Sequence, residues 1–355
     1  MAQQRSEGGG ALLGRPIVRS PGQVTVTQYL ESWLQSASLS LRPKTQRQYE
    51  QIARQHIGPT IGELMLADLH PDHIQSLYSA KLEHGASPST VRILHAVLHR
   101  ALSRAVRWGL IDRNPTDAVD RPRLRRKEMK TLTAEQVRCL LAAARASRLE
   151  TVLGLAVTTG LRQGELLGPR WSDLDWPTGH LRVQRQVQRI GGQGLVFGEP
   201  KSASGRRVVV LGPAMIGRLR TYQERQGLEK IVPGGRWQEN GLVFPSTIGT
   251  PMEARNLVRS FKALLKEAGL PEIRFHDLRH TAATLMLQQG VHPKIVQERL
   301  GHSQISLTLD IYSHVLPTMQ EEAARKLDSL LEASVDDLRG RAVSPTGSQG
   351  GGAAS

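Results

Sequence analysis

Four separated stretches of the sequence place strong hydrogen-bond donors where one element ends and the next begins. In the first, Arg162 follows a glycine that can end a helix, and Glu165 lies three residues further on, near enough to hold the guanidinium. In the second, Lys201 occupies a polar, glycine-containing turn between two β-rich segments. A guanidinium reaches a phosphate with a planar fork of donors, whereas an ammonium is a point charge or a proton donor. Each stretch suits an anion, and each taken alone also fits an ordinary exposed turn.

The third and fourth stretches add histidines and a tyrosine. His276 and Arg279 are three residues apart and precede an apolar helical pattern, so both can address one ligand, and His280 follows directly. His302 comes after a glycine, with Tyr312 ten residues later. Together the four stretches hold groups that neutralise negative charge, transfer protons and act as a nucleophile.

Residues 276–280 also have the His-x-x-x-His spacing of zinc peptidases. Those sites use a glutamate as general base, whereas Asp277 stands here, and Arg279 would put a fixed positive charge beside the metal. A third ligand would have to come from His302, His314 or a distant carboxylate. A zinc metallopeptidase is therefore the alternative from another class, and we expect no metal and no cofactor.

Strand patterns that can support these residues are confined to roughly residues 180–211. Leu181 and Val183 alternate with polar residues, and the segments 195–197 and 207–211 flank the turn that carries Lys201. This arrangement predicts a β-hairpin with Lys201 at its tip. The remainder of residues 131–333 has helical periodicity, so we expect a mostly helical catalytic domain with a small antiparallel sheet.

A second helical block precedes the catalytic candidates. Between residues 23 and 120, apolar residues recur at helical spacing and no catalytic constellation is present. Three prolines suit first-turn positions and three glycines suit helix stops: Pro43, Pro71 and Pro88, then Gly58, Gly85 and Gly109. The pattern predicts a bundle of about four helices. The whole chain is thus expected to be mainly α, of the α+β class.

The segments around these two domains are polar and differ in charge. Residues 1–22 and 334–355 are rich in small and polar residues, and we expect both ends to be disordered. Residues 121–130, RPRLRRKEMK, hold six basic residues and one glutamate, which predicts a basic interdomain linker. Its arginines are candidates for contact with the DNA backbone: Arg121, Arg123, Arg125 and Arg126. The alternative is a solvated linker.

Composition limits the class of partner. The chain has 355 residues, more than one typical domain, and 47 Lys and Arg against 32 Asp and Glu give a formal net charge of +15. Nucleic acid is therefore the leading partner class. A single cysteine, Cys139, excludes a disulfide framework and is expected to be a small buried hydrophobe. The sequence has neither an apolar membrane span nor a signal-peptide core, so we expect a cytoplasmic protein.

The four stretches, taken in order, resemble the tyrosine recombinase (phage integrase) family. The sequence reads TTGLRQGELLGPRW, EPKSASGRR, RFHDLRHT and LGHSQISLTLDIYSHV where the family has T-G-L-R-x-G-E-L, a hairpin lysine, H-x-L-R-H and L-G-H before a C-terminal tyrosine. The helical first block is similar to the family's core-type DNA-binding domain. The resemblance implies six catalytic residues: Arg162, Lys201, His276, Arg279, His302 and Tyr312.

The activity that the resemblance implies is site-specific DNA recombination without a metal. Tyr312 would be the nucleophile and form a 3′-phosphotyrosyl link, with the two arginines and His302 on the phosphate oxygens. The partners implied are double-stranded DNA and three further copies of the chain, as a homotetramer on two sites, with no membrane. Integration or excision of a phage or mobile element is the expected role, and resolution of chromosome dimers is the alternative within the family.

A helical stripe follows Tyr312. Its apolar members fall on the side opposite Glu321, Glu322, Arg325 and Asp328, and comprise Leu316, Met319, Ala323, Leu327, Leu330 and Leu331. The stripe has to be buried, either on its own domain or, as the family resemblance implies, on a neighbouring protomer.

Overall fold

The computed structural model describes residues 23–124, 129–145, 147–200, 203–306, 308–309, 324–325, 327–329 and 331. The chain separates into two compact units, Met1–Lys127 and Glu128–Ser355. The two ends that were expected to be disordered, residues 1–22 and 334–355, lie outside the described residues.

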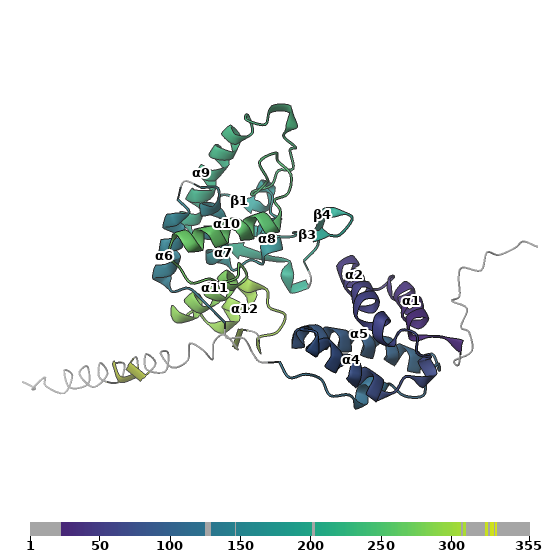
Figure 1. The fold of residues 1–355 in the computed structure, drawn as a ribbon. Coiled ribbons are helices and arrows are strands. Elements are labelled where there is room, and N and C mark those ends of the chain that lie inside the picture. Colours follow the sequence, from purple (N-terminus) through teal and green to yellow (C-terminus); the bar gives the residue numbers. More distant parts are fainter. Residues whose placement is uncertain are drawn as a thin grey trace, which may run out of the picture. The chain divides into compact units, whose positions relative to one another are not determined.

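The first unit is helical. Its longer helices are α1 (Val26–Ala37), α2 (Pro43–Ile52), α4 (Pro71–Glu83) and α5 (Pro88–Arg107) (Figure 1). The three prolines do occupy first-turn positions. The shorter helical segments are η2 (Ala53–Ile57), α3 (Gly58–Ile61), η3 (Leu66–Asp68) and η4 (Pro115–Ala118). The apolar faces of the long helices form one core with Trp33, Leu77 and Leu98 fully or almost fully buried.

One helix stop predicted for this unit is wrong. Gly85 and Gly109 follow α4 and α5 with left-handed backbone, as a C-terminal stop requires. Gly58 instead has helical angles, φ −49° and ψ −49°, and the chain runs from α2 through a π-helical turn into α3. A π-helical turn takes up an extra residue without ending the helix, so the chain stays helical through Gly58.

The second unit combines helices with two small sheets. The helices are α6 (Ala134–Ala143), α7 (Leu149–Thr159), α8 (Gln163–Leu166), α9 (Pro213–Glu229), α10 (Ala254–Glu267), α11 (Asp277–Gln288) and α12 (Pro293–Leu300), with η5 (Trp171–Asp173), η6 (Ala203–Gly205) and η7 (Gly234–Arg236) between them. A capping box begins α6, with Thr133 Oγ1 accepting from the Gln136 backbone N–H. The predicted fold class, mainly helical with a small antiparallel sheet, is confirmed.

The strands pair differently from the prediction. A three-stranded antiparallel sheet has the order β1 (Leu174–Asp175), β2 (His180–Val183), β5 (Arg207–Val210), and a two-stranded sheet pairs β3 (Gln186–Ile190) with β4 (Gly194–Gly198). The strands on either side of Lys201, β4 and β5, therefore belong to different sheets and do not form a hairpin with each other. Gly192 and Gly194, both with positive φ, lie at the tight turn of the β3–β4 hairpin. The partner of β4 is therefore β3 and not β5.

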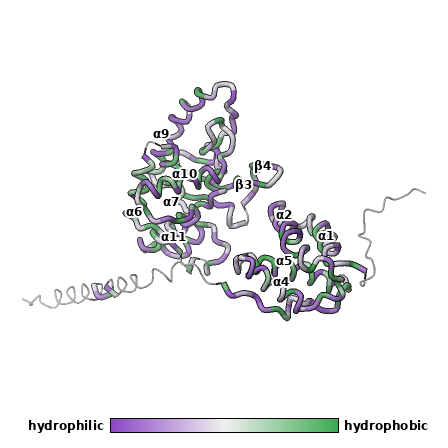
Figure 2. Tube along the Cα trace, viewed as in Figure 1, coloured by the Kyte–Doolittle hydropathy of each residue, from purple (hydrophilic) through white to green (hydrophobic). Residues whose placement is uncertain are grey.

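The core of the second unit surrounds α7. Nearly every residue of α7 is buried, and the helix contacts α6, α9 and α11 (Figure 1). In Figure 2 purple, hydrophilic positions are interspersed with green, hydrophobic ones along α9, as expected for a helix that packs on the core with one face. Cys139 is exposed on α6, so the expectation of a buried thiol is wrong. Among the described residues, no helix is both long and apolar enough to cross a membrane.

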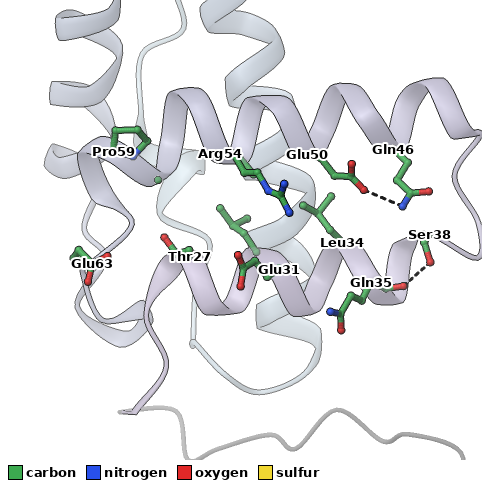
Figure 3. A pocket seen from close by; sticks show the side chains of 13 residues that line it. Thr27, Glu31, Leu34, Gln35, Ser38, Gln46, Glu50, Arg54, Pro59 and Glu63 are labelled. Atoms are coloured by element: carbon green, nitrogen blue, oxygen red, sulfur yellow. Dashed lines mark hydrogen bonds between the residues drawn. The ribbon is translucent and has the colours of Figure 1, made fainter. Parts of the chain in front are cut away.

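A groove of about 670 Å³ lies in the first unit, between α1 and the run from α2 to α3 (Figure 3). Leu30, Leu34 and Ala53 contribute apolar lining, and Gln46 Nε2 donates to Glu50 Oε1 over 3.0 Å at one end. None of the four catalytic candidates that the structure describes lines this groove.

Candidate active site

Arg162 is placed by the end of α7. Gly160 terminates that helix with φ 64° and ψ 24°, a left-handed conformation that reverses the chain within two residues. A Cβ at this position would collide with the Leu300 side chain, so the glycine also allows α12 to pack closely. Arg162 then caps α8, where its Nη1 donates to Glu165 Oε1 over 2.8 Å and its Nη2 donates to the Gly301 carbonyl over 3.2 Å. The expected contact with Glu165 is thus present.

Arg279 lies inside the first turn of α11, not ahead of the helix as the sequence suggested. The start of α11 is fixed because Asp277 accepts hydrogen bonds from the Arg274 backbone N–H over 2.8 Å and from Arg274 Nη2 over 2.7 Å. Arg279 Nη1 donates to the Gly160 carbonyl over 2.7 Å, while its Nη2 is buried with no hydrogen-bond partner in the described structure. Only 4% of Arg279 is exposed.

The positive charges of Arg162 and Arg279 repel each other. Burial, with the nearby Arg162 charge, lowers the pKa of Arg279 to about 9. The guanidinium is still protonated at neutral pH, but its charge is poorly compensated. An anion placed at the unpartnered Nη2 would satisfy the donor and relieve the repulsion.

His302 follows α12 through Gly301, which has φ 70°. Its Nδ1 lies 2.9 Å from Thr308 Oγ1, which leaves Nε2 to face another group. Burial, followed by the charges of Arg279 and Arg162, lowers the pKa of His302 to about 3. The ring is therefore neutral near pH 7 until a negative charge enters the site.

His276 caps α11 beside His280, whose ring is 5.4 Å away and at 88° to it. Partial burial, the neighbouring His280 and the Arg279 charge lower the pKa of His276 to about 4. A neutral imidazole of this kind can accept a proton at neutral pH. His280 Nδ1 is buried without a hydrogen-bond partner among the described residues.

The structure brings Arg162, Arg279, His276 and His302 to one side of the second unit, at the ends of α7 and α12 and the start of α11. Lys201 and Tyr312 lie outside the described residues, as do Arg125 and Arg126 of the predicted linker. Arg121 and Arg123 are exposed at the end of the first unit. No group of three or more metal-ligating side chains occurs in the described part of the chain.

Sequence reasoning missed several residues that hold this site together. Arg207 begins β5 and points to the same face as buried Val209, as the two-residue period of a strand requires. The two-residue period of this strand was the sequence signal that could have shown that Arg207 faces inward. The Arg274–Asp277 pair and Thr308 had no local pattern to mark them, since their roles depend on which segments meet in the fold.

Both units of the chain are similar to known proteins. Residues 130–319 match the family model described as "Phage integrase family", and residues 25–82 match "Phage integrase, N-terminal SAM-like domain". A "Tyrosine recombinase XerC-like" protein of Caldanaerobacter subterraneus is 32% identical over 86% of this chain and 83% of its own length. The "ICEBs1 integrase" of Bacillus subtilis is 28% identical over 88% of this chain and 85% of its own.

Solved structures share the fold at lower sequence identity. The Tn1549 transposon integrase, solved in complex with a circular intermediate DNA, matches with a TM-score of 0.73 and 22% identity, over 85% of this chain and 99% of that one. A lambda integrase tetramer bound to a Holliday junction matches with a TM-score of 0.61 and 22% identity, over 81% of this chain and 77% of that one.

Proposed function

This chain belongs to the phage integrase family and is a tyrosine-type site-specific recombinase, and we propose that it cuts and rejoins double-stranded DNA for a phage or other mobile element. The observation that carries the proposal is the buried, unpartnered Nη2 of Arg279 beside Arg162 and His302. A phosphodiester fits that donor set, because its two non-bridging oxygens need several hydrogen-bond donors and positive charge.

We assign the nucleophile to Tyr312. Its phenolic oxygen attacks the scissile phosphorus, the bond from phosphorus to the 5′ oxygen breaks, and the strand is left as a 3′-phosphotyrosyl ester with a free 5′ hydroxyl. Arg162, Arg279 and His302 stabilise the charge on the pentavalent phosphorus. One phosphoester is exchanged for another, so rejoining by a 5′ hydroxyl needs no nucleoside triphosphate.

Two further residues transfer protons to and from the reacting oxygens. The phenol of Tyr312, with an ordinary pKa of about 10, must lose its proton as it attacks. His276 accepts this proton, a role supported by its place at the start of α11, three residues before Arg279. Lys201 delivers a proton to the departing 5′ oxygen. The proton lost at one oxygen is thus matched by one gained at the other.

The basic linker and the assembly are part of the same proposal. Arg121 and Arg123, with Arg125 and Arg126, contact DNA phosphates as the chain passes between its two units, in line with the exposure of Arg121 and Arg123. We propose a homotetramer on two DNA sites. The lambda integrase tetramer on a Holliday junction, which shares this fold, supports that assembly.

The relatives favour integration or excision over resolution of chromosome dimers, although both roles are compatible with the fold. Proteins named integrase include those of Saccharopolyspora erythraea and of the element ICEBs1. The XerC-like relative keeps the resolvase alternative open. Recovery of DNA covalently trapped by the protein in its host, followed by sequencing, separates an element's attachment site from a chromosomal dimer site.

The nucleophile is tested with a nicked DNA substrate that releases a short strand after cleavage and so traps the covalent adduct. Tyr312→Phe should bind this DNA as the unchanged protein does but form no adduct, since the ring lacks the attacking oxygen. Tyr49→Phe, which keeps the ring stacked on Trp33 in the first unit, is the control and should form adduct normally. Adduct formation by Tyr312→Phe refutes the assignment.

A further inference from the structure

Arg207 lies at the start of β5, yet its side chain is only 8% exposed. The next residues of the strand alternate, with Val208 and Val210 outside and Val209 inside. Arg207 therefore points a long charged side chain into the second unit, where burial of an arginine is costly unless its donors are satisfied.

Each nitrogen of that guanidinium has a partner on a different segment. Nη2 donates to Glu165 Oε2 over 3.1 Å, Nε donates to the Arg299 carbonyl over 2.7 Å, and Nη1 donates to the Gly205 carbonyl over 3.1 Å. Arg207 thus joins α8, the end of α12 and the foot of the turn that precedes β5. All three nitrogens of the guanidinium therefore bond inside the protein, and the 8% exposure of the side chain leaves it little surface to offer to DNA.

Glu165 is the link between Arg207 and the candidate site. Its Oε1 accepts from Arg162 Nη1 over 2.8 Å, and its Oε2 accepts both from Arg207 Nη2 over 3.1 Å and from the Arg162 backbone N–H over 3.2 Å. The side chain is 2% exposed. Burial alone would raise the pKa of Glu165, but the Arg207 charge and then the hydrogen bond from Arg162 lower it below its ordinary value.

The backbone packs tightly around the same guanidinium. A Cβ on Gly301 would lie 2.8 Å from Arg207 Nη1 and 2.7 Å from the Ser204 carbonyl. The Gly301 carbonyl in turn accepts the second hydrogen bond of Arg162, and the next residue is His302. Arg207 therefore contacts both supports of Arg162, the carboxylate directly and the Gly301 segment by packing.

We propose that Arg207 is a positioning residue for strand cleavage: it holds the Glu165 carboxylate and the Gly301 segment in place, and through them it orients Arg162 toward the scissile phosphate. This inference rests on the proposed function. Arg207 itself does not touch the DNA. Its loss should slow cleavage in the same way as loss of Arg162, and with little change in DNA affinity.

The test compares two substrates in single-turnover cleavage at saturating DNA. One carries the ordinary scissile phosphate. In the other a methylphosphonate replaces it, which removes the negative charge that Arg162 is proposed to neutralise. Arg207→Ala should cleave the phosphate about 10²-fold more slowly than the unchanged protein, comparable to loss of an oriented oxyanion donor. On the methylphosphonate this difference should shrink, as it should for Arg162→Ala.

Matched variants separate positioning from folding. Arg207→Lys keeps the charge but places its donors on one nitrogen instead of three, so it should recover part of the rate. Arg148→Ala removes another partly buried ion pair, with Glu229 at 3.1 Å, at the opposite end of α7, about 16 Å away for a helix of this length. It should leave cleavage unchanged. If Arg207→Ala does not fold, Arg207→Lys and Arg207→Gln provide the same two-substrate comparison.

Three outcomes overturn the inference. The first is an equal defect of Arg207→Ala on both substrates, and the second is a normal cleavage rate. The third is rescue by a substrate with sulfur at the 5′ bridging position, whose leaving group needs no proton, because this would assign Arg207 to the Lys201 turn instead. Absence of adduct with the unchanged protein would contradict the proposed function itself, which distinguishes that failure from failure of the Arg207 inference.

Discussion

At the scale of residues, the candidate site holds more positive charge than the protein neutralises. Arg162, Arg207 and Arg279 lie around one buried carboxylate, Glu165, and Asp277 is already paired with Arg274. Burial first, and then the neighbouring arginine charges, lower the pKa values of Arg279 and His302. Such a site lowers the free energy of unfolding of the DNA-free protein, and a bound phosphate relieves the repulsion. Substitutions that remove positive charge here should therefore raise stability and lower activity.

Arg279 offers a direct measure of that opposition. Arg279→Met keeps much of the side-chain volume but removes a buried charge with an unpartnered nitrogen, so we expect the DNA-free protein to gain about 1 kcal/mol or more in free energy of unfolding. Cleavage should fall by about 10²-fold or more. Arg274→Met is the control, because it removes a charge that is paired with Asp277 and should destabilise the protein. Chemical denaturation and adduct formation measure both effects; a destabilised Arg279→Met would contradict the argument.

His302 makes the stability of the second unit depend on pH. Its pKa is about 3 in the folded protein against about 6.5 for an ordinary histidine, so as pH falls the unfolded chain binds the proton first. The contribution of His302 to stability is therefore complete above about pH 6.5 and is lost progressively between pH 6.5 and 3. His302→Gln should flatten the decline in unfolding free energy between pH 7 and 4. The unfolding free energy is measured by urea denaturation at each pH. If it declines as steeply with falling pH in His302→Gln as in the unchanged protein, His302 does not titrate as described.

At the scale of elements, helix boundaries were more predictable than contacts between elements. First-turn prolines and the glycine after α7 are local signals, and each acts where the sequence suggested. The strand partners of β4 and β5 were not predictable from alternation alone, because alternation shows that a strand has a buried face but not which strand lies beside it.

The same distinction applies to the site. The residue types and their order mark the candidates and predict that Glu165 holds Arg162, but they do not predict the other contacts that hold the site. Arg279 bonds to the carbonyl of Gly160, which is 119 residues away in the sequence, and Arg207 reaches a carbonyl on α12. These partners exist only after α7, α11 and α12 have packed together.

Gly160 shows how one residue serves both the backbone and the packing. Gly160→Ala places a Cβ at φ 64° and against Leu300, whereas Gly269→Ala in the same unit has φ 63° and meets no atom within 4 Å. Both should lose about 1 kcal/mol from the left-handed backbone, and Gly160→Ala should lose more because of the collision. Adding Leu300→Ala to Gly160→Ala should cost less than Leu300→Ala costs the unchanged protein. Thermal unfolding tests this, and equal losses for the two glycine variants would exclude the collision.

At the scale of the whole molecule, the stripe that follows Tyr312 raises the question of assembly. Leu327 and Leu331 are among its described members and are 60% and 62% exposed. The remaining apolar members, Leu316, Met319, Ala323 and Leu330, lie outside the described residues. Exposed leucines on one helical stripe favour burial by another molecule over packing within the chain, and the proposed tetramer would supply that molecule.

A chain that ends after Pro317 keeps Tyr312 and loses most of this stripe. If the stripe docks on a neighbouring protomer, the shortened chain should bind a single DNA site with normal affinity but lose cooperative binding to paired sites and complete strand exchange. The double variant Leu327→Ser with Leu331→Ser should reproduce this loss in the full-length chain, whereas Asp328→Ser, on the polar side, should not. Gel-shift titrations on single and paired sites, with recombination assayed in parallel, give the answer. Full recombination by the shortened chain would rule out docking, and a shortened chain that fails to fold while the double-serine protein recombines normally would indicate that the stripe packs within its own domain.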